Sequence, residues 1–233
     1  MNSKSEHQKS VHQPIESPKS EAELEARALK IAGLTVRELA SRFGLPLPES
    51  STRGKGFAGT LAELALGANA GNRSEPDFVE LGVELKTIPL DQRGRPLETT
   101  FVCTVPLHHI IELEFEDSPL LHKLRRVFFL PIEGEADLPD RRFGIGFFYS
   151  PSEEELATIR RDWELFGELI ASQDLEAIDA TLGEIVQIRP KGSNAEERVL
   201  GPLQDEGLSY ARPLGFYLRA SHTRAIVARA LGL

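Results

Sequence analysis

The alternation of apolar and polar positions along the chain predicts a mixed α/β protein. Residues 83–88 alternate with the period of two that places successive side chains on opposite faces of a β-strand. Short runs rich in branched and aromatic residues predict further strands. A turn is predicted between the first two strands, at Arg93-Gly94-Arg95-Pro96. We expect a central sheet from 83–88, 99–105, 126–132 and 144–149, followed by two later strands at 185–189 and 216–218.

Amphipathic segments with helix-capping residues in front of them predict the helices. Ser20, Thr35 and Ser152 stand where an N-cap would accept a backbone hydrogen bond. The predicted helices span 20–32, 35–43, 59–66, 152–172, 175–181 and 221–231. Residues 1–18 contain almost no large apolar side chain, which predicts a disordered polar tail in front of a folded domain at 19–233.

The composition is that of an ordinary globular protein. The 233 residues suit one domain or two lobes, and 40% are hydrophobic while 27% are charged. No apolar run approaches the length of a membrane span, and the N-terminus lacks the apolar stretch of a secretory signal. A single cysteine, Cys103, excludes an internal disulfide and lies in an apolar strand, so we expect a buried thiol. These features predict a cytoplasmic protein.

The net charge of −9 is concentrated in one segment. Residues 133–184 hold 14 acidic and 4 basic side chains, a balance of −10, so the rest of the chain carries +1. Basic residues gather at 123–126 and 189–229. Since the local field of one face governs binding to a polyanion, the charge is compatible with DNA binding. The acidic segment would then face away from DNA, toward solvent or a partner protein.

The candidate chemistry lies at Asp77, Glu84 and Lys86, in the pattern D-x6-E-x-K. Glu84 and Lys86 share one face of the predicted strand, while Val83 and Leu85 face a core. If Asp77 folds back beside Glu84, two carboxylates could hold Mg²⁺, and the lysine could orient water or stabilise charge on a phosphate. The alternative is a solvated face of an amphipathic strand. We find no motif for a covalent nucleophile, a zinc site or a phosphate-binding loop.

The Pro-Asp dipeptide before this pattern resembles the PD-(D/E)xK nuclease superfamily, and the surrounding blocks are similar to the MutH family of mismatch-repair endonucleases. The similarity covers roughly residues 20–233. The similar blocks are Gly54–Gly59, Leu61–Leu64, Leu66–Ala68, Leu81–Thr104, His122–Glu135, Glu184–Ala195 and Gly215–Thr223.

This resemblance implies a restriction-endonuclease-like mixed sheet flanked by helices, with two lobes around a DNA-binding cleft. It also implies an Mg²⁺-dependent active site in which Glu63 is a third carboxylate ligand beside Asp77 and Glu84. The backbone carbonyl of Leu85 would reach the metal as well. Lys123 would be a second active-site lysine beside Lys86.

The resemblance further implies nicking of the unmethylated strand, 5′ to the G of hemimethylated GATC, activated by MutL with MutS acting through it. Arg189 and Lys191 would contact base edges in the major groove, and Tyr217 would lie near the tested adenine. Lys55 would contact DNA. Glu98 and Phe101 would lie near the DNA, although a surface carboxylate and a core aromatic are their alternatives.

Two other functions remain open. A restriction-type enzyme of the same fold would cut both strands of GATC regardless of methylation, but such relatives are usually longer or dimeric, so the size of this chain favours a monomeric repair enzyme. The second open function is a DNA-binding module without catalytic activity. Residues 107–119, with His108 and His109, and residues 196–212 depart from the family, so we predict that the histidine pair lies in a variable loop.

Overall fold

The computed structural model describes residues 15–49, 56–71, 74–191, 199–202 and 208–232. Its helices are α1 (Glu21–Ile31), α2 (Val36–Arg42), α3 (Phe57–Leu66), α4 (Pro119–Leu124), α5 (Glu153–Ala171) and α6 (Ala220–Leu231). Its strands are β1 (Glu84–Leu90), β2 (Thr100–Thr104), β3 (Val127–Glu133), β4 (Phe147–Tyr149), β5 (Val186–Pro190), β6 (Val199–Pro202), β7 (Leu208–Ala211) and β8 (Leu214–Leu218). The described residues also form five short 3₁₀ turns, which are η1 (Val79–Leu81), η2 (Ile110–Glu112), η3 (Phe115–Asp117), η4 (Leu138–Asp140) and η5 (Leu175–Ala177).

The strands form two three-stranded sheets and a hairpin. One sheet has the order β1-β3-β4 and is mixed, because β1 and β3 are parallel while β3 and β4 are antiparallel. The other has the antiparallel order β2-β8-β5, and β6 pairs with β7. The mixed α/β class is therefore confirmed. The prediction that 99–105 joins the same sheet as 83–88 is wrong.

The reason for this difference lies at the turn between β1 and β2. Pairing there ends at the Leu90–Pro96 bridge and at the hydrogen bond from Leu97 N–H to the Pro89 carbonyl. Pro89 and Pro96 have no N–H to extend a ladder. The chain then leaves β1, and β2 pairs with β8, with Phe101 opposite Tyr217.

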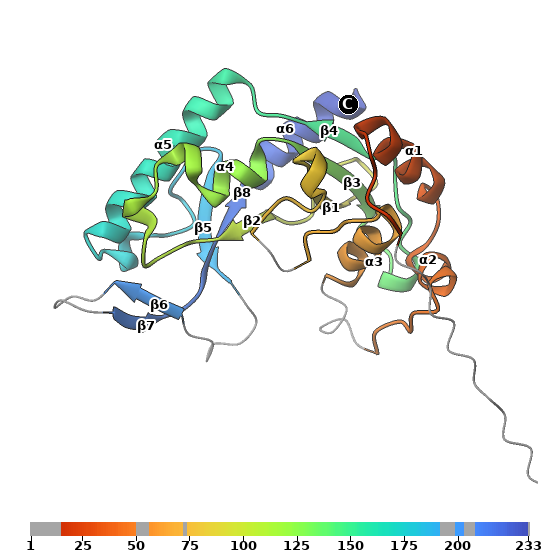
Figure 1. Ribbon diagram of the computed structural model, residues 1–233, viewed down its shortest axis with the longest axis horizontal. Helices are drawn as coiled ribbons and strands as arrows, with labels where there is room; N and C mark the ends of the chain where they lie inside the picture. Colours follow the sequence, from red (N-terminus) through yellow and green to blue (C-terminus); the bar gives the residue numbers. More distant parts are fainter. Residues whose placement is uncertain (1–14, 50–55, 72–73, 192–198, 203–207, 233) are drawn as a thin grey trace, which may run out of the picture.

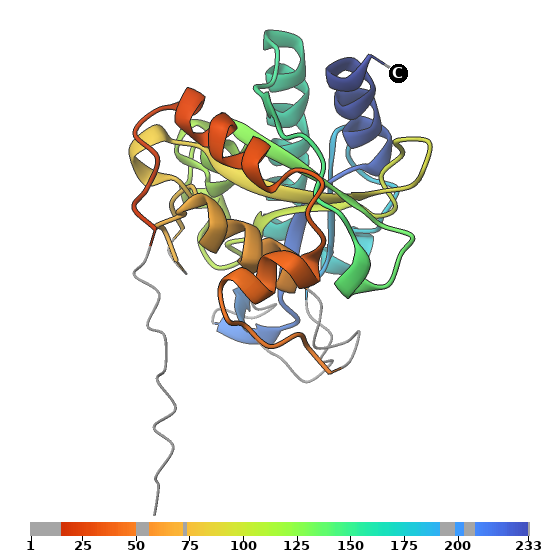
Figure 2. The same ribbon diagram turned by 90° about the vertical axis from the view of Figure 1, so that its right-hand side faces the viewer.

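Strand β3 separates two apolar cores. Its burial is continuous from Val127 to Ile132, as expected for a strand covered on both faces. Phe128 and Leu130 pack with α1, α2 and α3, while Val127 and Phe129 face the core that holds the second sheet and α5. Figures 1 and 2 show α1, α2 and α3 gathered on one side of the chain and α5 on the other.

The three predicted N-caps are confirmed. Ser20, Thr35 and Ser152 are the N-caps of α1, α2 and α5, and the last two complete capping boxes with Glu38 and Glu155. The prediction of a helix over 175–181 is wrong, because only the 3₁₀ turn η5 forms there. The Asp174 side chain caps this turn by accepting a hydrogen bond from Ala177 N–H. Strand β4 is also shorter than predicted.

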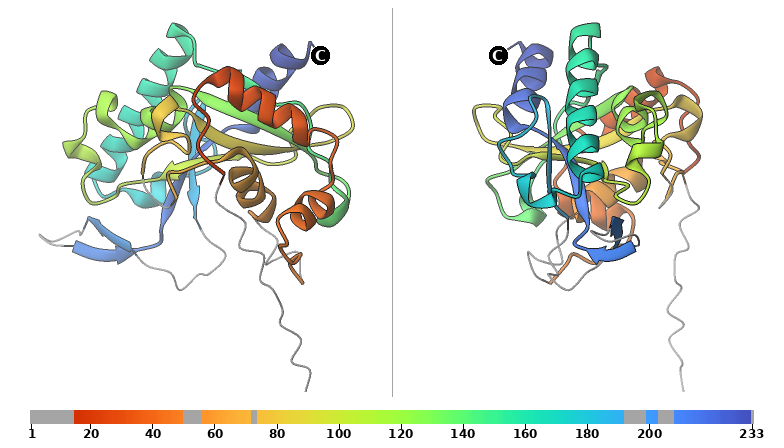
Figure 3. Two further views of the ribbon diagram at one scale, coloured as in Figure 1. Left: turned by 45° about the vertical axis from the view of Figure 1, so that its right-hand side comes forward. Right: turned by 90° about the vertical axis from the view of Figure 1, so that its left-hand side faces the viewer.

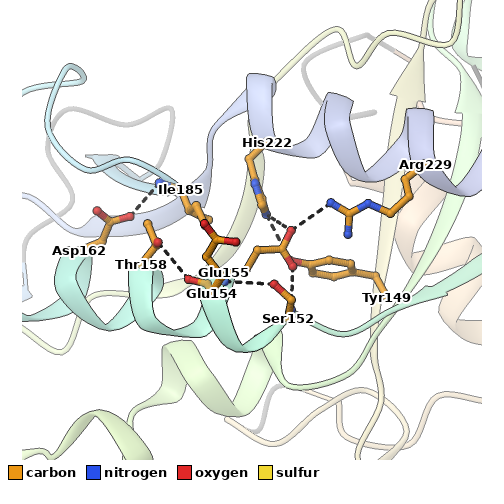
Figure 4. A network of polar contacts seen from close by, with 9 residues as sticks. All are labelled: Tyr149, Ser152, Glu154, Glu155, Thr158, Asp162, Ile185, His222 and Arg229. Carbon is orange, nitrogen blue, oxygen red and sulfur yellow. Dashed lines mark hydrogen bonds and ion pairs between the residues drawn. The ribbon is translucent and has the colours of Figure 1, made fainter.

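A polar network joins the two sheets through α5 and α6. In Figure 4, Tyr149 of β4 donates a hydrogen bond to Glu155 at 3.3 Å, and its hydroxyl lies 3.2 Å from His222 Nε2. Arg229 forms a 3.3 Å ion pair with the same glutamate. Figure 3 shows α5 and α6 side by side at one end of the molecule. The contacts of Glu155 tie β4 of the first sheet to α6, which follows β8 of the second.

Part of the predicted N-terminal tail is described. Residues 1–14 lie outside the described residues, whereas Pro18 is buried and Arg27 donates a hydrogen bond to the Glu16 carbonyl at 2.5 Å. Cys103 is buried, as predicted, and burial raises the pKa of its thiol to about 12. Among the described residues, no helix combines the length and the apolar character needed to cross a membrane.

Candidate active site

Strand β1 places Glu84 and Lys86 side by side between the two sheets. Val83 and Leu85 point to the core around α1, α2 and α3, so the even-numbered residues face the other core. Lys86 Nζ lies 2.5 Å from Glu84 Oε1, and Glu84 is only 2% exposed. The pattern of alternation therefore reflects two apolar cores, and the alternative of a solvated strand face does not hold for Glu84.

Lys123 approaches the same carboxylate from α4. The Ser118 side chain caps this helix, and Pro119 occupies its first turn. Lys123 Nζ donates to the other oxygen of Glu84, Oε2, at 2.8 Å and to the Glu75 carbonyl at 2.5 Å. Each oxygen of Glu84 is thus held by one lysine, which offsets the cost of burying the carboxylate.

A tight turn brings Asp77 back to β1. The backbone of Phe78 and Val83 forms a bridge around η1, and Gly82 closes the turn at a φ of 63°, which glycine adopts without strain. Asp77 Oδ2 accepts a hydrogen bond from Leu85 N–H at 2.8 Å. Asp77 therefore folds back beside the strand that carries Glu84 and Lys86, as anticipated from the sequence.

The electrostatic environment of Asp77 is unfavourable for its charge. Burial, and then the nearby Glu84 carboxylate, raise the pKa of Asp77 to about 6, against the opposing effects of the Leu85 N–H and the two lysines. Asp77 makes no ion pair with another described residue. A cation at this carboxylate would relieve both causes of the raised pKa.

Glu63 lies on α3 and lines a cavity of about 420 Å³ together with Lys86. Partial burial, and then the charge of Glu84, raise the pKa of Glu63. Its apolar neighbours do not cover it, because the residue remains exposed and Leu64 is exposed as well. Glu63 is therefore open to the cavity that it shares with Lys86.

The donor set suits a hard cation. Mg²⁺ prefers oxygen ligands and is usually held by one or two carboxylates, with water and substrate phosphate completing its shell. Asp77 and Glu84 supply the carboxylates, and both Asp77 and Glu63 have a raised pKa that a cation would lower. Within the described residues, acidic, histidine and cysteine side chains form no closed group of three metal ligands. The described residues that could hold a cation are thus Asp77 and Glu84, with Glu63 at the neighbouring cavity.

Phe101 lies on β2 of the second sheet, and its ring is close to Lys86 of β1. Its ring contacts Tyr217 edge to face, with centroids 5.3 Å apart. Lys86 Nζ lies 5.9 Å from the centroid of the Phe101 ring, and Lys191 Nζ lies 5.0 Å from it. Phe101 is half-buried rather than a core residue. Glu98 is exposed and lines the same cavity as Tyr217 and Glu63.

Arg189 and Lys191 are exposed at the end of β5, as a DNA-contacting role requires. The Arg189 guanidinium donates to Thr99 Oγ1 at 3.0 Å, and Lys191 Nζ donates to Thr104 Oγ1 at 2.7 Å. The two cationic groups are therefore spread along β2. Lys55 lies outside the described residues.

The residues that sequence reasoning missed are His108 and His109. Both line a second cavity, of about 730 Å³, together with Glu84, Lys86 and Lys123. The predicted loop is present between β2 and η2, but it borders the candidate active site. No spacing rule in the sequence reveals this placement, because it depends on where β2 pairs.

Comparison with known proteins gives a consistent result. The family model described as DNA mismatch repair enzyme MutH matches residues 66–162. The DNA mismatch repair protein MutH of a Shewanella species, strain MR-7, is 42% identical over 221 residues, which cover 94% of this chain and 99% of the relative. The protein of the same name from Shewanella amazonensis is 44% identical over 215 residues, covering 91% and 96%. That from Shewanella baltica OS185 is 42% identical over 217 residues, covering 92% and 97%.

Proposed function

Because this chain belongs to the MutH family of DNA mismatch repair enzymes, we propose that it is an Mg²⁺-dependent endonuclease that nicks the unmethylated strand of hemimethylated GATC, 5′ to the G. The observation that carries the proposal is the arrangement around Glu84. One buried carboxylate is held by Lys86 and Lys123, and Asp77, on the adjoining turn, has a raised pKa.

The roles of the residues follow from their chemistry. Asp77 and Glu84, with Glu63 at the cavity and the carbonyl of Leu85, would hold Mg²⁺. When bound, the ion would polarise a phosphoryl oxygen and would lower the pKa of a water molecule. Lys86 and Lys123 hold the two oxygens of Glu84 in place, and their ammonium groups would favour the extra negative charge of an attacked phosphate.

The second sheet would read the sequence. Arg189 and Lys191 are exposed cations suited to guanine O6 and N7 in the major groove. Tyr217 lies next to Phe101 and lines the cavity that holds Glu63. A methyl group on adenine N6 adds bulk and removes a donor hydrogen, so a close Tyr217 contact would discriminate against it. Glu98, Phe101 and Lys55 would contact the DNA near the cut.

The proposal includes an architecture and partners. We infer a restriction-endonuclease-like arrangement in which α1, α2 and α3 with β1 belong to one lobe and the β2-β8-β5 sheet to the other, with DNA between them. The enzyme would act as a monomer in the cytoplasm. MutL, loaded by MutS at a mismatch, would activate it, because unrestrained nicking at every GATC would be harmful.

Substitution at the site tests the proposal. Asp77→Ala, Glu84→Ala and Lys86→Ala should each abolish Mg²⁺-dependent nicking and leave DNA binding largely intact, since these residues handle the metal and the water rather than base edges. Glu80→Ala, an exposed carboxylate on the turn between Asp77 and Glu84, is the matched control. Near wild-type nicking by one of the three variants would remove that residue from the mechanism.

A further inference from the structure

The larger cavity beside the active site extends beyond the residues assigned to catalysis. It has a volume of about 730 Å³, and Glu84, Lys86 and Lys123 line one part of it. The rest of its polar lining comes from Ser74, Thr104, Lys191, His108 and His109, above an apolar wall from β2 and the segment that follows. Its ionic lining consists of three lysines and one glutamate, so the cavity favours an anion.

The backbone holds the two histidines firmly at this cavity. After β2, Val105 N–H binds the Leu214 carbonyl, and His109 N–H binds the Pro106 carbonyl at 3.1 Å. Leu107 and Ile110, which flank the pair, are 3% and 2% exposed and anchor the segment in the core. The two imidazole rings pack edge to face with centroids 3.7 Å apart. The rings therefore stand on a fixed turn.

The imidazoles also retain their hydrogen-bonding capacity. His108 is exposed and His109 is half-buried, and neither ring makes a hydrogen bond or ion pair with a described residue. The lysines of the cavity differ, since Lys86 and Lys123 bind Glu84, and Lys191 binds Thr104. The histidine N–H groups are thus the donors best placed to take up a new anionic partner.

We propose that His108 and His109 bind a backbone phosphate of the DNA strand that is cut, close to the phosphate that is hydrolysed. The inference rests on the proposed nuclease function, because Glu84 and Lys86 fix where the reacting phosphate lies. A phosphodiester strand that reaches these residues has its neighbouring phosphates within the same positively charged cavity. Imidazole N–H groups bind phosphate oxygens without reading bases, so the contact holds the strand in place and adds no sequence preference.

The test separates binding from catalysis. In nicking assays on a hemimethylated GATC duplex, the double variant His108→Ala/His109→Ala should raise KM about tenfold and leave kcat within about twofold, as expected for loss of ground-state binding. In an Asp77→Asn background, which prevents cutting, Kd should rise by the same factor for duplexes with and without GATC. The variant His108→Arg/His109→Arg should restore both values.

The control is His122→Ala. This histidine is exposed on α4 next to Lys123 but does not line the cavity, so its loss should change neither KM nor Kd. An unchanged KM in a double variant with the wild-type melting temperature would overturn the inference, as would an equal effect of His122→Ala. If the double variant fails to fold, His108→Gln alone must show the raised KM. A different result would refute the proposed nuclease function and leave this inference intact: wild-type protein that binds DNA through His108 and His109 but does not nick it.

Discussion

Replacing Asp77 by asparagine should stabilise the metal-free protein at neutral pH. Asparagine has nearly the same shape, and its Oδ1 can still accept the hydrogen bond that Leu85 N–H donates at 2.8 Å. The substitution removes a negative charge that burial and Glu84 disfavour. A stabilising change at a residue proposed to hold the metal is the behaviour expected when an active site is maintained at a cost in stability.

The magnitude follows from the pKa of Asp77. A rise from 3.8 to about 6 corresponds to roughly 3 kcal/mol, which solvent access reduces to an expected gain of about 1–3 kcal/mol. The folded state binds the proton more tightly than the unfolded state does. The wild-type protein therefore loses stability as pH rises from about 4 to about 6, and the loss is complete above that range. The gain from Asp77→Asn should be full at pH 7.5 and disappear near pH 4.

Urea unfolding of both proteins between pH 4 and pH 8, in EDTA, measures this difference. Asp91→Asn is the control with the opposite sign, because hydrogen bonds from Arg95 and Arg93 lower the pKa of Asp91. That variant should be less stable than wild type at pH 7.5, and the loss should vanish as pH falls. The reasoning would be refuted if the Asp77→Asn variant were no more stable than wild type at pH 7.5. It would also be refuted if the variant were stabilised equally at pH 4 and pH 7.5.

Three further predictions concern stability, base reading and activation. Asp162→Ala should lower the free energy of unfolding by about 2–4 kcal/mol, because Asp162 accepts hydrogen bonds from three backbone N–H groups at the start of β5. Urea titration measures this loss. Glu164 is exposed on the same helix, so Glu164→Ala should change the free energy of unfolding little. Tyr217→Ser should reduce the preference for the unmethylated strand, and an unchanged preference in this variant would place the methyl sensor elsewhere. Arg189→Ala should instead slow nicking of every substrate, by about 1–3 kcal/mol in kcat/KM. Cognate MutL with ATP should increase nicking of hemimethylated DNA, and no increase would exclude this regulation.

The sequence predicted strand β1 and its neighbouring charged residues because local patterns determine them. Alternation in residues 83–88 placed Glu84 beside Lys86, and the turn after Asp77 required only a short return to the strand. The capping residues Ser20, Thr35 and Ser152 located three helix starts. These features depend on neighbours a few residues apart, which a sequence displays directly.

Features that depend on distant pairing were not predicted. The pairing of β2 with β8 brings residues more than a hundred positions apart into register, and no local pattern shows it. His108 and His109 reach the active-site cavity only because of that pairing. Asp162 belonged to an acidic segment expected to face solvent or a partner, yet it is buried and accepts a hydrogen bond from the first backbone N–H of β5. A helix-face pattern alone does not reveal which carboxylate has such a partner.

The most direct test of the central claim is strand-resolved cleavage of GATC duplexes with Mg²⁺, with each strand labelled separately. The duplexes should be unmethylated, methylated on either strand and methylated on both. We predict a nick 5′ to the G in unmethylated strands only, no cutting of the fully methylated duplex and no activity in EDTA. Cutting of both strands regardless of methylation would identify a restriction-type enzyme, and binding without any Mg²⁺-dependent nick would contradict the proposed nuclease.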